Sequence, residues 1–232
     1  MEFEHAATVA VAGLLTVAGL YPAYGWLEDR HAARSAWRHT DADADGLALV
    51  DDPDADGDGL PGRLDPDADG DGVANVPDVV AAARALIGQR SDPLMGKYGN
   101  LLGRIGFRVC TDVVVDAWLA AGWSLPAQLR DAALASPSQF ETTPDNLPGD
   151  PYFVRRVRNY VDLFEHGADL TLAETPRPGD LAFYGRAHVA LVVERTAVSY
   201  RVVEAYGARV AVRDGQEIEA RVGERGRFGR VR

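Results

Sequence analysis

The sequence predicts an α+β fold in which helices precede an antiparallel sheet. Two segments, 111–123 and 155–166, repeat apolar side chains at the helical period. Four apolar or β-branched runs follow Pro178-Gly179 and suit strands, at 180–184, 188–194, 200–205 and 209–213. Because the helices come first and short turns join the strands, we expect the helices to pack on one antiparallel sheet.

The composition is that of a globular chain with one strongly acidic segment. The 232 residues are 47% hydrophobic and carry a net charge of −11. Residues 41–78 hold thirteen aspartates and one arginine, so the rest of the chain is close to neutral. The sequence outside this segment has no basic face with interleaved aromatic residues, so we exclude nucleic acid as a partner. The single cysteine excludes an internal disulfide and a thiolate metal cluster.

Residues 1–40 form the first of three predicted domains. Residues 6–27 carry no formal charge and are long enough to cross a bilayer, although Pro22 interrupts them. Three arginines follow this stretch: Arg30, Arg34 and Arg38. By the positive-inside rule alone, these arginines would keep the body of the protein in the cytoplasm. We expect an apolar N-terminal helix that acts as a membrane anchor or export signal, with a buried helix of a soluble protein as the alternative.

Residues 41–90, the second predicted domain, begin with three aspartate-rich repeats. The pattern Asp-x-Asp-x-Asp-Gly recurs at an identical offset of thirteen residues, and each unit has another aspartate at its twelfth position. This is the spacing of a calcium loop, in which side chains 1, 3, 5 and 12 converge on one cation and glycine 6 permits a sharp turn. The predicted ligands are Asp41, Asp43, Asp45 and Asp52, then Asp54, Asp56, Asp58 and Asp65, and finally Asp67, Asp69, Asp71 and Asp78. An acidic, solvated linker is the alternative interpretation.

The three units resemble thrombospondin type 3 calcium repeats and, loosely, dockerin loops. They lack the cysteines of the former, and they have Asp where EF-hands have Glu at position 12. The resemblance implies a calcium-stiffened spacer. Like charges at this density predict a segment that is extended without the ion and compact with it. A short helix at 78–89, with Pro77 in its first turn, would abut the last loop.

Residues 91–232, the third predicted domain, contain the only cysteine, Cys110, where a helix begins. Exposed amides and the dipole at a helix N-terminus favour the thiolate, which is the reactive form of cysteine. Asp112 would support the start of the same helix. The alternative is an inert cysteine packed in the core.

His188 enters a strand far downstream of Cys110 and is the predicted base. If the strands on either side form a hairpin about Thr196, paired residues have numbers that sum to 392, and His188 lies opposite Glu204. Glu204 would then hold Nδ1 of the imidazole and favour its charged form. Asp112 and Asp116 are alternative candidates for the carboxylate that orients His188. Glu204 could also be an ordinary solvent-exposed residue of its strand.

Three motifs resemble the NlpC-type branch of papain-like cysteine peptidases. They are Cys110-Thr111-Asp112, Arg177-Pro178-Gly179-Asp180-Leu181-Ala182-Phe183-Tyr184 and His188-Val189-Ala190-Leu191-Val192-Val193. The chain is similar to a bacterial branch whose nucleophile lies in Val-Cys-Thr-Asp-Val-Val, and the likeness begins at Tyr98, where a tyrosine often precedes the nucleophile. It implies a papain-like fold with Cys110 as nucleophile, His188 as base and Glu204 as the polar third residue. The superfamily commonly has His, Asn or Gln at the third position and Asp-Cys-Ser-Gly around the nucleophile, and these departures leave the substrate open.

Together these features predict a papain-like cysteine peptidase or amidase that cleaves an amide in cell-wall peptide or a related peptide. We expect it outside the cytoplasm, membrane-anchored or secreted, because loops built from Asp suit millimolar calcium. Calcium would be structural, and catalysis would use no cofactor. Two alternatives remain: an acyltransferase that forms the same cysteine thioester, and a non-catalytic, calcium-dependent surface-binding protein.

Overall fold

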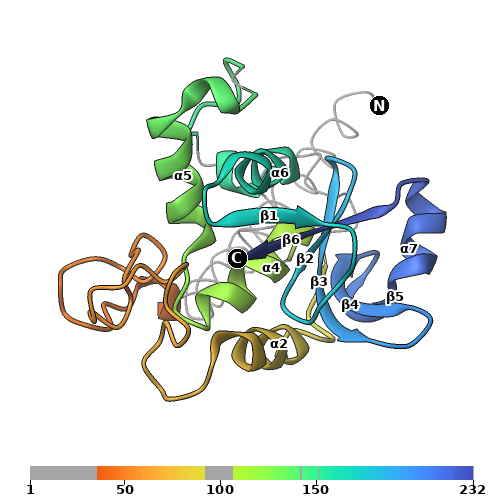
Figure 1. Cartoon of the computed structure of the whole chain (residues 1–232), viewed down its shortest axis with the longest axis horizontal. Helices are drawn as coiled ribbons and strands as arrows, with labels where there is room; N and C mark the ends of the chain where they lie inside the picture. Colours follow the sequence, from red (N-terminus) through yellow and green to blue (C-terminus); the bar gives the residue numbers. More distant parts are fainter. Residues whose placement is uncertain (1–35, 92–106, 142, 151, 232) are drawn as a thin grey trace, which may run out of the picture.

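The computed structural model describes residues 36–91, 107–141, 143–150 and 152–231 (Figure 1). It confirms the α+β class, and its described strands form one antiparallel sheet in the order β1-β6-β2-β3-β4-β5. The strands are β1 (Leu170–Ala173), β2 (Leu181–Tyr184), β3 (His188–Arg195), β4 (Tyr200–Tyr206), β5 (Arg209–Asp214) and β6 (Gly226–Val231). The α-helices are α2 (Asn75–Ala85), α4 (Cys110–Leu119), α5 (Leu125–Ala135), α6 (Val157–His166) and α7 (Gly215–Val222). Short 3-10 helices lie at η1 (Ala36–His39), η2 (Pro137–Gln139) and η3 (Phe153–Arg155).

The sheet separates two apolar clusters. One face, which includes Phe183 and Leu191, packs against α2, α4, α5 and α6. Tyr184 and Val192 lie on the other face with Ile218 of α7. Because successive side chains of a strand point to opposite faces, both sides of β2 and β3 are buried, which accounts for their nearly unbroken apolar sequences.

The four predicted strands are confirmed as β2 to β5, each to within one residue at either end. The first predicted helix is shorter than expected, because α4 ends at Leu119 and a turn follows. The pattern does not predict α5, α7, β1 or β6. Two of the six residues of β6 are glycines, which weakens its strand pattern in the sequence. Gly229 is needed there, because a Cβ at this position would lie 2.7 Å from the ring of Phe183. The close packing of these strands therefore requires the residue that weakens the strand signal.

The aspartate-rich segment packs on the body of the molecule, where a spacer was expected. A Cβ at Gly122, just after α4, would lie 2.0 Å from the carbonyl oxygen of Ala68 in the third repeat. The hydroxyl of Ser124 donates to the carbonyl of Val50 in the first repeat. Figure 1 shows the repeats as loops next to α2 and to the start of α5. The loops are therefore fixed to the helical layer at several points.

Helix α2 joins the repeats to the core. The expected helix at 78–89 begins earlier and ends earlier, at Asn75 and Ala85. Its Val79 and Ala83 are fully buried in the larger apolar cluster, and α2 contacts both α4 and β3. The helix that follows the third repeat is thus part of the main core.

The predicted membrane segment, residues 6–27, lies outside the described residues, as does Tyr98. Within the part of the chain that the structure describes, no helix combines the length and the apolar character needed to span a bilayer.

Candidate active site and metal loops

Cys110 is the first residue of α4, as predicted. The preceding Val109 has an extended backbone, and its N–H donates to the carboxylate of Asp112 at 2.9 Å. Asp112 therefore supports the start of the helix, which is the role the sequence predicts for it. Cys110 is partly buried against the larger apolar cluster, with the positive end of the helix behind its thiol.

His188 and Glu204 are in direct contact, but by a register that differs from the prediction. Nε2 of His188 lies 2.6 Å from Oε2 of Glu204, so the predicted use of Nδ1 is wrong. On the side of His188, strands β3 and β4 pair Leu191 with Val203, and the paired numbers there sum to 394 where 392 was expected. The expected register is therefore wrong by two residues. A shift by an even number keeps both side chains on one face, and a diagonal neighbour lies within reach of a long side chain.

Cys110 also lies close enough to the imidazole of His188 to affect its pKa. Since Nε2 is engaged by Glu204, Nδ1 is the ring nitrogen left for an interaction with the thiol. Burial of the ring opposes its protonation, but the interactions with Cys110 and Glu204 outweigh burial and raise the pKa of His188 to about 9. Rings of Tyr184 and Tyr206 flank the imidazole, with centroids 5.9 and 6.1 Å away. The three predicted catalytic residues thus form one connected series with a protonated histidine at its centre.

Two arginines that the sequence analysis did not single out hold Glu204. The Glu204 side chain is fully buried, and its carboxylate lies 2.9 Å from Arg213 on β5 and 2.9 Å from Arg221 on α7. Burial favours the neutral carboxyl, but hydrogen bonds from His188 and Arg221 prevail and lower the pKa of Glu204. Arg213 lies on the face of Glu204 in the observed register of β4 and β5, and alternation would have placed it there only with that register known. No sequence signal pointed to Arg221, since the pattern does not predict α7.

Asp116, the second rival for the orienting role, lies elsewhere. It is buried within α4 and forms ion pairs with Arg38, before the first repeat, and with Arg108. Asp112 pairs with Arg155 at 3.2 Å. Neither carboxylate is the residue that holds His188.

Cys110 opens into a cleft of about 600 Å³. The walls come from the start of α4, from residues 155–158 at the start of α6, and from Arg186 and Ala187 just before His188. Tyr152 and Asp145 complete the lining. A cleft of this size suits a peptide segment or another small ligand beside the thiol.

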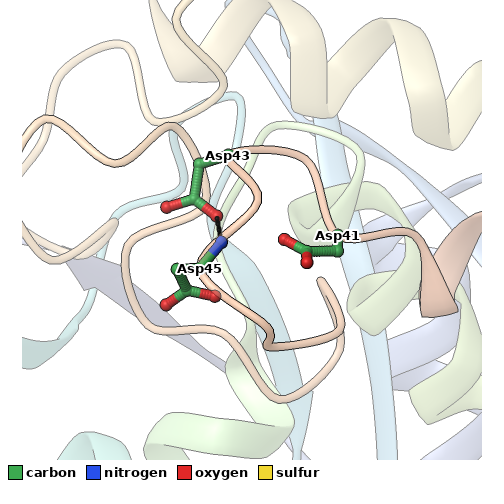
Figure 2. A group of neighbouring side chains, drawn as sticks. All are labelled: Asp41, Asp43 and Asp45. Carbon is green, nitrogen blue, oxygen red and sulfur yellow. Dashed lines mark hydrogen bonds between the residues drawn. The ribbon is translucent and has the colours of Figure 1, made fainter.

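The predicted metal-binding aspartates gather into three groups. In each repeat, one carboxylate oxygen from positions 1, 3 and 5 lies within 4.8 Å of the other two, and such a group could hold a metal ion. Figure 2 shows the first group, Asp41, Asp43 and Asp45, around one loop. Glycine at position 6 has a positive φ in all three repeats, as the motif predicts: Gly46 (97°), Gly59 (93°) and Gly72 (90°). The N–H of each of these glycines donates to the carboxylate at position 1 of its own repeat.

The aspartates at position 12 complete the pattern. Asp52 and Asp65 are at least nine-tenths buried, and each keeps one oxygen without a hydrogen-bond partner among the described residues. Asp78, in the first turn of α2, also has such an oxygen. Partial burial raises the pKa of Asp78, and the carboxylates of Asp71 and Asp67 in the same repeat raise it further. Buried, unpartnered oxygens beside like charges are a cost that a bound cation would remove.

Comparison of the chain with protein-family models, with curated proteins and with solved structures finds no match. The functional interpretation therefore depends on the geometry of these residues.

Proposed function

We propose that this protein is a cysteine-dependent amide hydrolase of the papain-like, NlpC type, with Cys110, His188 and Glu204 as its catalytic residues. The main support is the connected series of these side chains at the edge of a cleft. A protonated imidazole beside a sulfur stabilises the thiolate, and the buried carboxylate of Glu204 holds that imidazole in place. Helices on an antiparallel sheet, with the cysteine at a helix start and the histidine on a strand, give further support to this proposal.

The proposed reaction has two stages. The Cys110 thiolate attacks the carbonyl carbon of an amide, and amides at the start of α4, including that of Cys110, stabilise the oxyanion. His188 then donates its proton to the leaving nitrogen, the C–N bond breaks, and a thioester forms. In the second stage, His188 accepts a proton from water as the water oxygen attacks the thioester. The carboxylic acid leaves, and the thiolate and imidazolium are restored.

We infer that the three loops bind Ca²⁺ as a structural ion. Each loop offers carboxylate oxygens from positions 1, 3 and 5, and calcium prefers six to eight oxygen ligands of this kind. The unpartnered oxygens at position 12 support a further ligand from Asp52, Asp65 and Asp78. Ligands built from aspartate alone suit millimolar calcium, which favours a place outside the cytoplasm, with residues 6–27 as anchor or export signal and cell-wall peptide or a related peptide as substrate.

Alkylation of Cys110 tests the catalytic proposal without knowledge of the substrate. At pH 6.5 an ordinary thiol is only about 1% thiolate, so a thiolate held by imidazolium should react with iodoacetamide about tenfold faster than glutathione. His188→Gln should remove this advantage. The matched control is His166→Gln, an exposed histidine in the last turn of α6, which should react like the wild type. A slow reaction that is the same in both variants would show that Cys110 is an inert core residue.

Hydrolysis itself is tested with soluble cell-wall peptides and mass spectrometry. The wild type should release fragments with a new amine and a new carboxylate, and Cys110→Ala should release none. A fragment whose acyl group is joined to an added amine, and not to water, would identify an acyltransferase instead.

Calcium binding is tested by titration followed with circular dichroism and calorimetry. Calcium should order the chain at concentrations where magnesium does not, because the loops offer a larger and more flexible set of oxygens than magnesium accepts. Asp67→Asn, at position 1 of the third repeat, should weaken binding at one site. Asp131→Asn, an exposed aspartate on α5, is the matched control and should leave every site intact. Absence of any response to calcium would reduce the repeats to an acidic segment.

A further inference from the structure

The cleft at Cys110 is lined by an excess of positive charge. Four of its lining residues are arginines, Arg155, Arg156, Arg158 and Arg186, against one acidic residue, Asp145. Guanidinium groups bind carboxylates in a planar, two-point geometry that a single ammonium group does not provide.

Three of the four arginines have a close carboxylate partner that is not among the residues lining the cleft. Arg155 lies 3.2 Å from Asp112, Arg158 lies 3.0 Å from Glu141, and Arg186 lies 2.6 Å from Asp162. These pairs fix the shape of the wall and leave it with little net charge.

Arg156 is different, because its close hydrogen-bond partners are neutral. Its Nη1 donates to the backbone carbonyl of Asp145 and, at 2.7 Å, to the side-chain oxygen of Asn146. The nearest carboxylates, of Asp145 and Asp150, are each 3.9 Å from Nη2, beyond hydrogen-bond distance. Arg156 therefore lies in ion-pair range of two carboxylates but donates a hydrogen bond to neither, and its two hydrogen bonds to neutral groups use Nη1 alone, which leaves Nη2 as a donor for a ligand.

A buried amide network holds Arg156 in this position. Asn146 and Asn159 are both fully buried and exchange hydrogen bonds of 2.9 and 3.0 Å through their side chains. Asn159 also donates to the carbonyl of Phe153. Asn146 thus presents its oxygen to Arg156 from a rigid base, so little side-chain entropy remains to be lost when a ligand binds.

Arg156 lies next to the start of α4. The hydroxyl of Thr111, which follows Cys110, donates to the carbonyl of Arg155 at 3.3 Å. Arg156 is also the residue directly before α6, so the first turns of α4 and α6 both open on the cleft and add to its attraction for anions.

We propose that Arg156 binds a carboxylate of the substrate in the cleft beside Cys110, so that the enzyme prefers amides with a carboxylate close to the scissile bond. This inference rests on the proposed function, since it assigns a specificity residue to the same cleft. One well-oriented guanidinium with hydrogen-bond donors to spare suits a monoanionic carboxylate. A phosphate dianion would favour several uncompensated arginines, which the cleft does not offer.

The test compares two alkylating reagents that differ only in charge. Iodoacetate carries a carboxylate and iodoacetamide does not, and both react with the same thiol. We expect the ratio of the iodoacetate rate to the iodoacetamide rate to exceed that of glutathione by about tenfold, the effect of one charge-assisted contact. The iodoacetate rate should saturate with concentration, because binding precedes alkylation. Arg156→Gln should return the ratio to the glutathione value, and Arg156→Lys should restore part of it.

The controls separate this inference from the proposed function. Arg201→Gln, an exposed arginine on β4, removes the same charge outside the cleft and should leave the ratio unchanged. The ratio is internal to each variant, so it remains decisive even if both absolute rates are slow. Fast alkylation by both reagents with a ratio equal to that of glutathione would refute the carboxylate site and leave the hydrolase proposal intact. Succinate should protect Cys110 better than inorganic phosphate does, and the reverse order would also overturn the proposal.

If Arg156→Gln does not fold, two measurements on the wild type test the carboxylate site instead: saturation of the alkylation rate with iodoacetate concentration, and protection of Cys110 by succinate. Both measurements need no variant, and a linear rate without protection would contradict the inference.

Discussion

Removal of the Glu204 charge should lower the pKa of His188 and change how stability depends on pH. Glu204→Gln keeps the size and the hydrogen-bonding capacity of a side chain that is fully buried 2.6 Å from Nε2. A pKa raised from 6.5 to about 9 corresponds to roughly 3 kcal/mol in favour of the imidazolium. An opposite charge in contact accounts for about 1 to 3 pH units of such a change, so the variant should titrate at about 8 or below.

The titration is read by NMR of the imidazole carbons and nitrogens, with His188→Gln to assign the signals among the five histidines. The matched control is Glu194→Gln, an exposed glutamate near the other end of β3, which should leave the pKa near 9. The raised pKa stabilises the fold fully below pH 6.5, and this contribution is lost as the pH rises through 9. Denaturant unfolding at pH 6 and pH 10 should therefore differ less in Glu204→Gln than in the wild type. A wild-type pKa near 6.5, or no change in the Glu204 variant, would refute the reasoning.

Three further substitutions test the fold. Ala44→Gly should raise the melting temperature, with a gain of about 1 kcal/mol, because Ala44 has a φ of 67°, where a Cβ is strained. Gly122→Ala should lower the free energy of unfolding by more than about 2 kcal/mol, since its φ is 79° and its Cβ would overlap Ala68, and unchanged stability in urea would contradict the docking of the repeats. Asp116→Asn should lower the free energy of unfolding by about 3 kcal/mol, because it leaves two partly buried arginines, Arg38 and Arg108, without their shared carboxylate. A loss below about 1 kcal/mol would show that these two ion pairs contribute little to stability.

The sequence predicted the place of Cys110 at a helix start and the contact between His188 and Glu204 because each obeys a local rule. Cys110 begins a helix of regular apolar period, and His188 and Glu204 have the same parity on adjoining strands. The register prediction was wrong because the hairpin turns between Thr196 and Ser199 and not about Thr196, so that the pairs nearest the turn sum to 395. An irregularity between Val192 and Glu194 then brings the sum to 394 on the side of His188, and sequence periodicity reveals neither feature. An error of two residues keeps His188 and Glu204 on the same face of the sheet, so their contact was predicted correctly from an incorrect alignment of the strands.

Other parts of the site depend on tertiary contacts that leave no pattern in the sequence. Arg221 reaches Glu204 from α7, a helix of eight residues with little apolar character. The spacing of the aspartates predicted the loop geometry, but the docking of the loops depends on single residues such as Gly122 and Ser124. No periodicity marks such residues, because their role is set by what approaches them from elsewhere in the chain.

Helix α2 links the acidic loops to the apolar interior. Asp78 stands in its first turn as the last predicted ligand of the third loop, and Val79, the next residue, has no exposed surface. A cation held by the loop would therefore anchor one end of a helix that supports both α4 and β3. Removal of such an ion would therefore be felt in the apolar interior as well as in the loop.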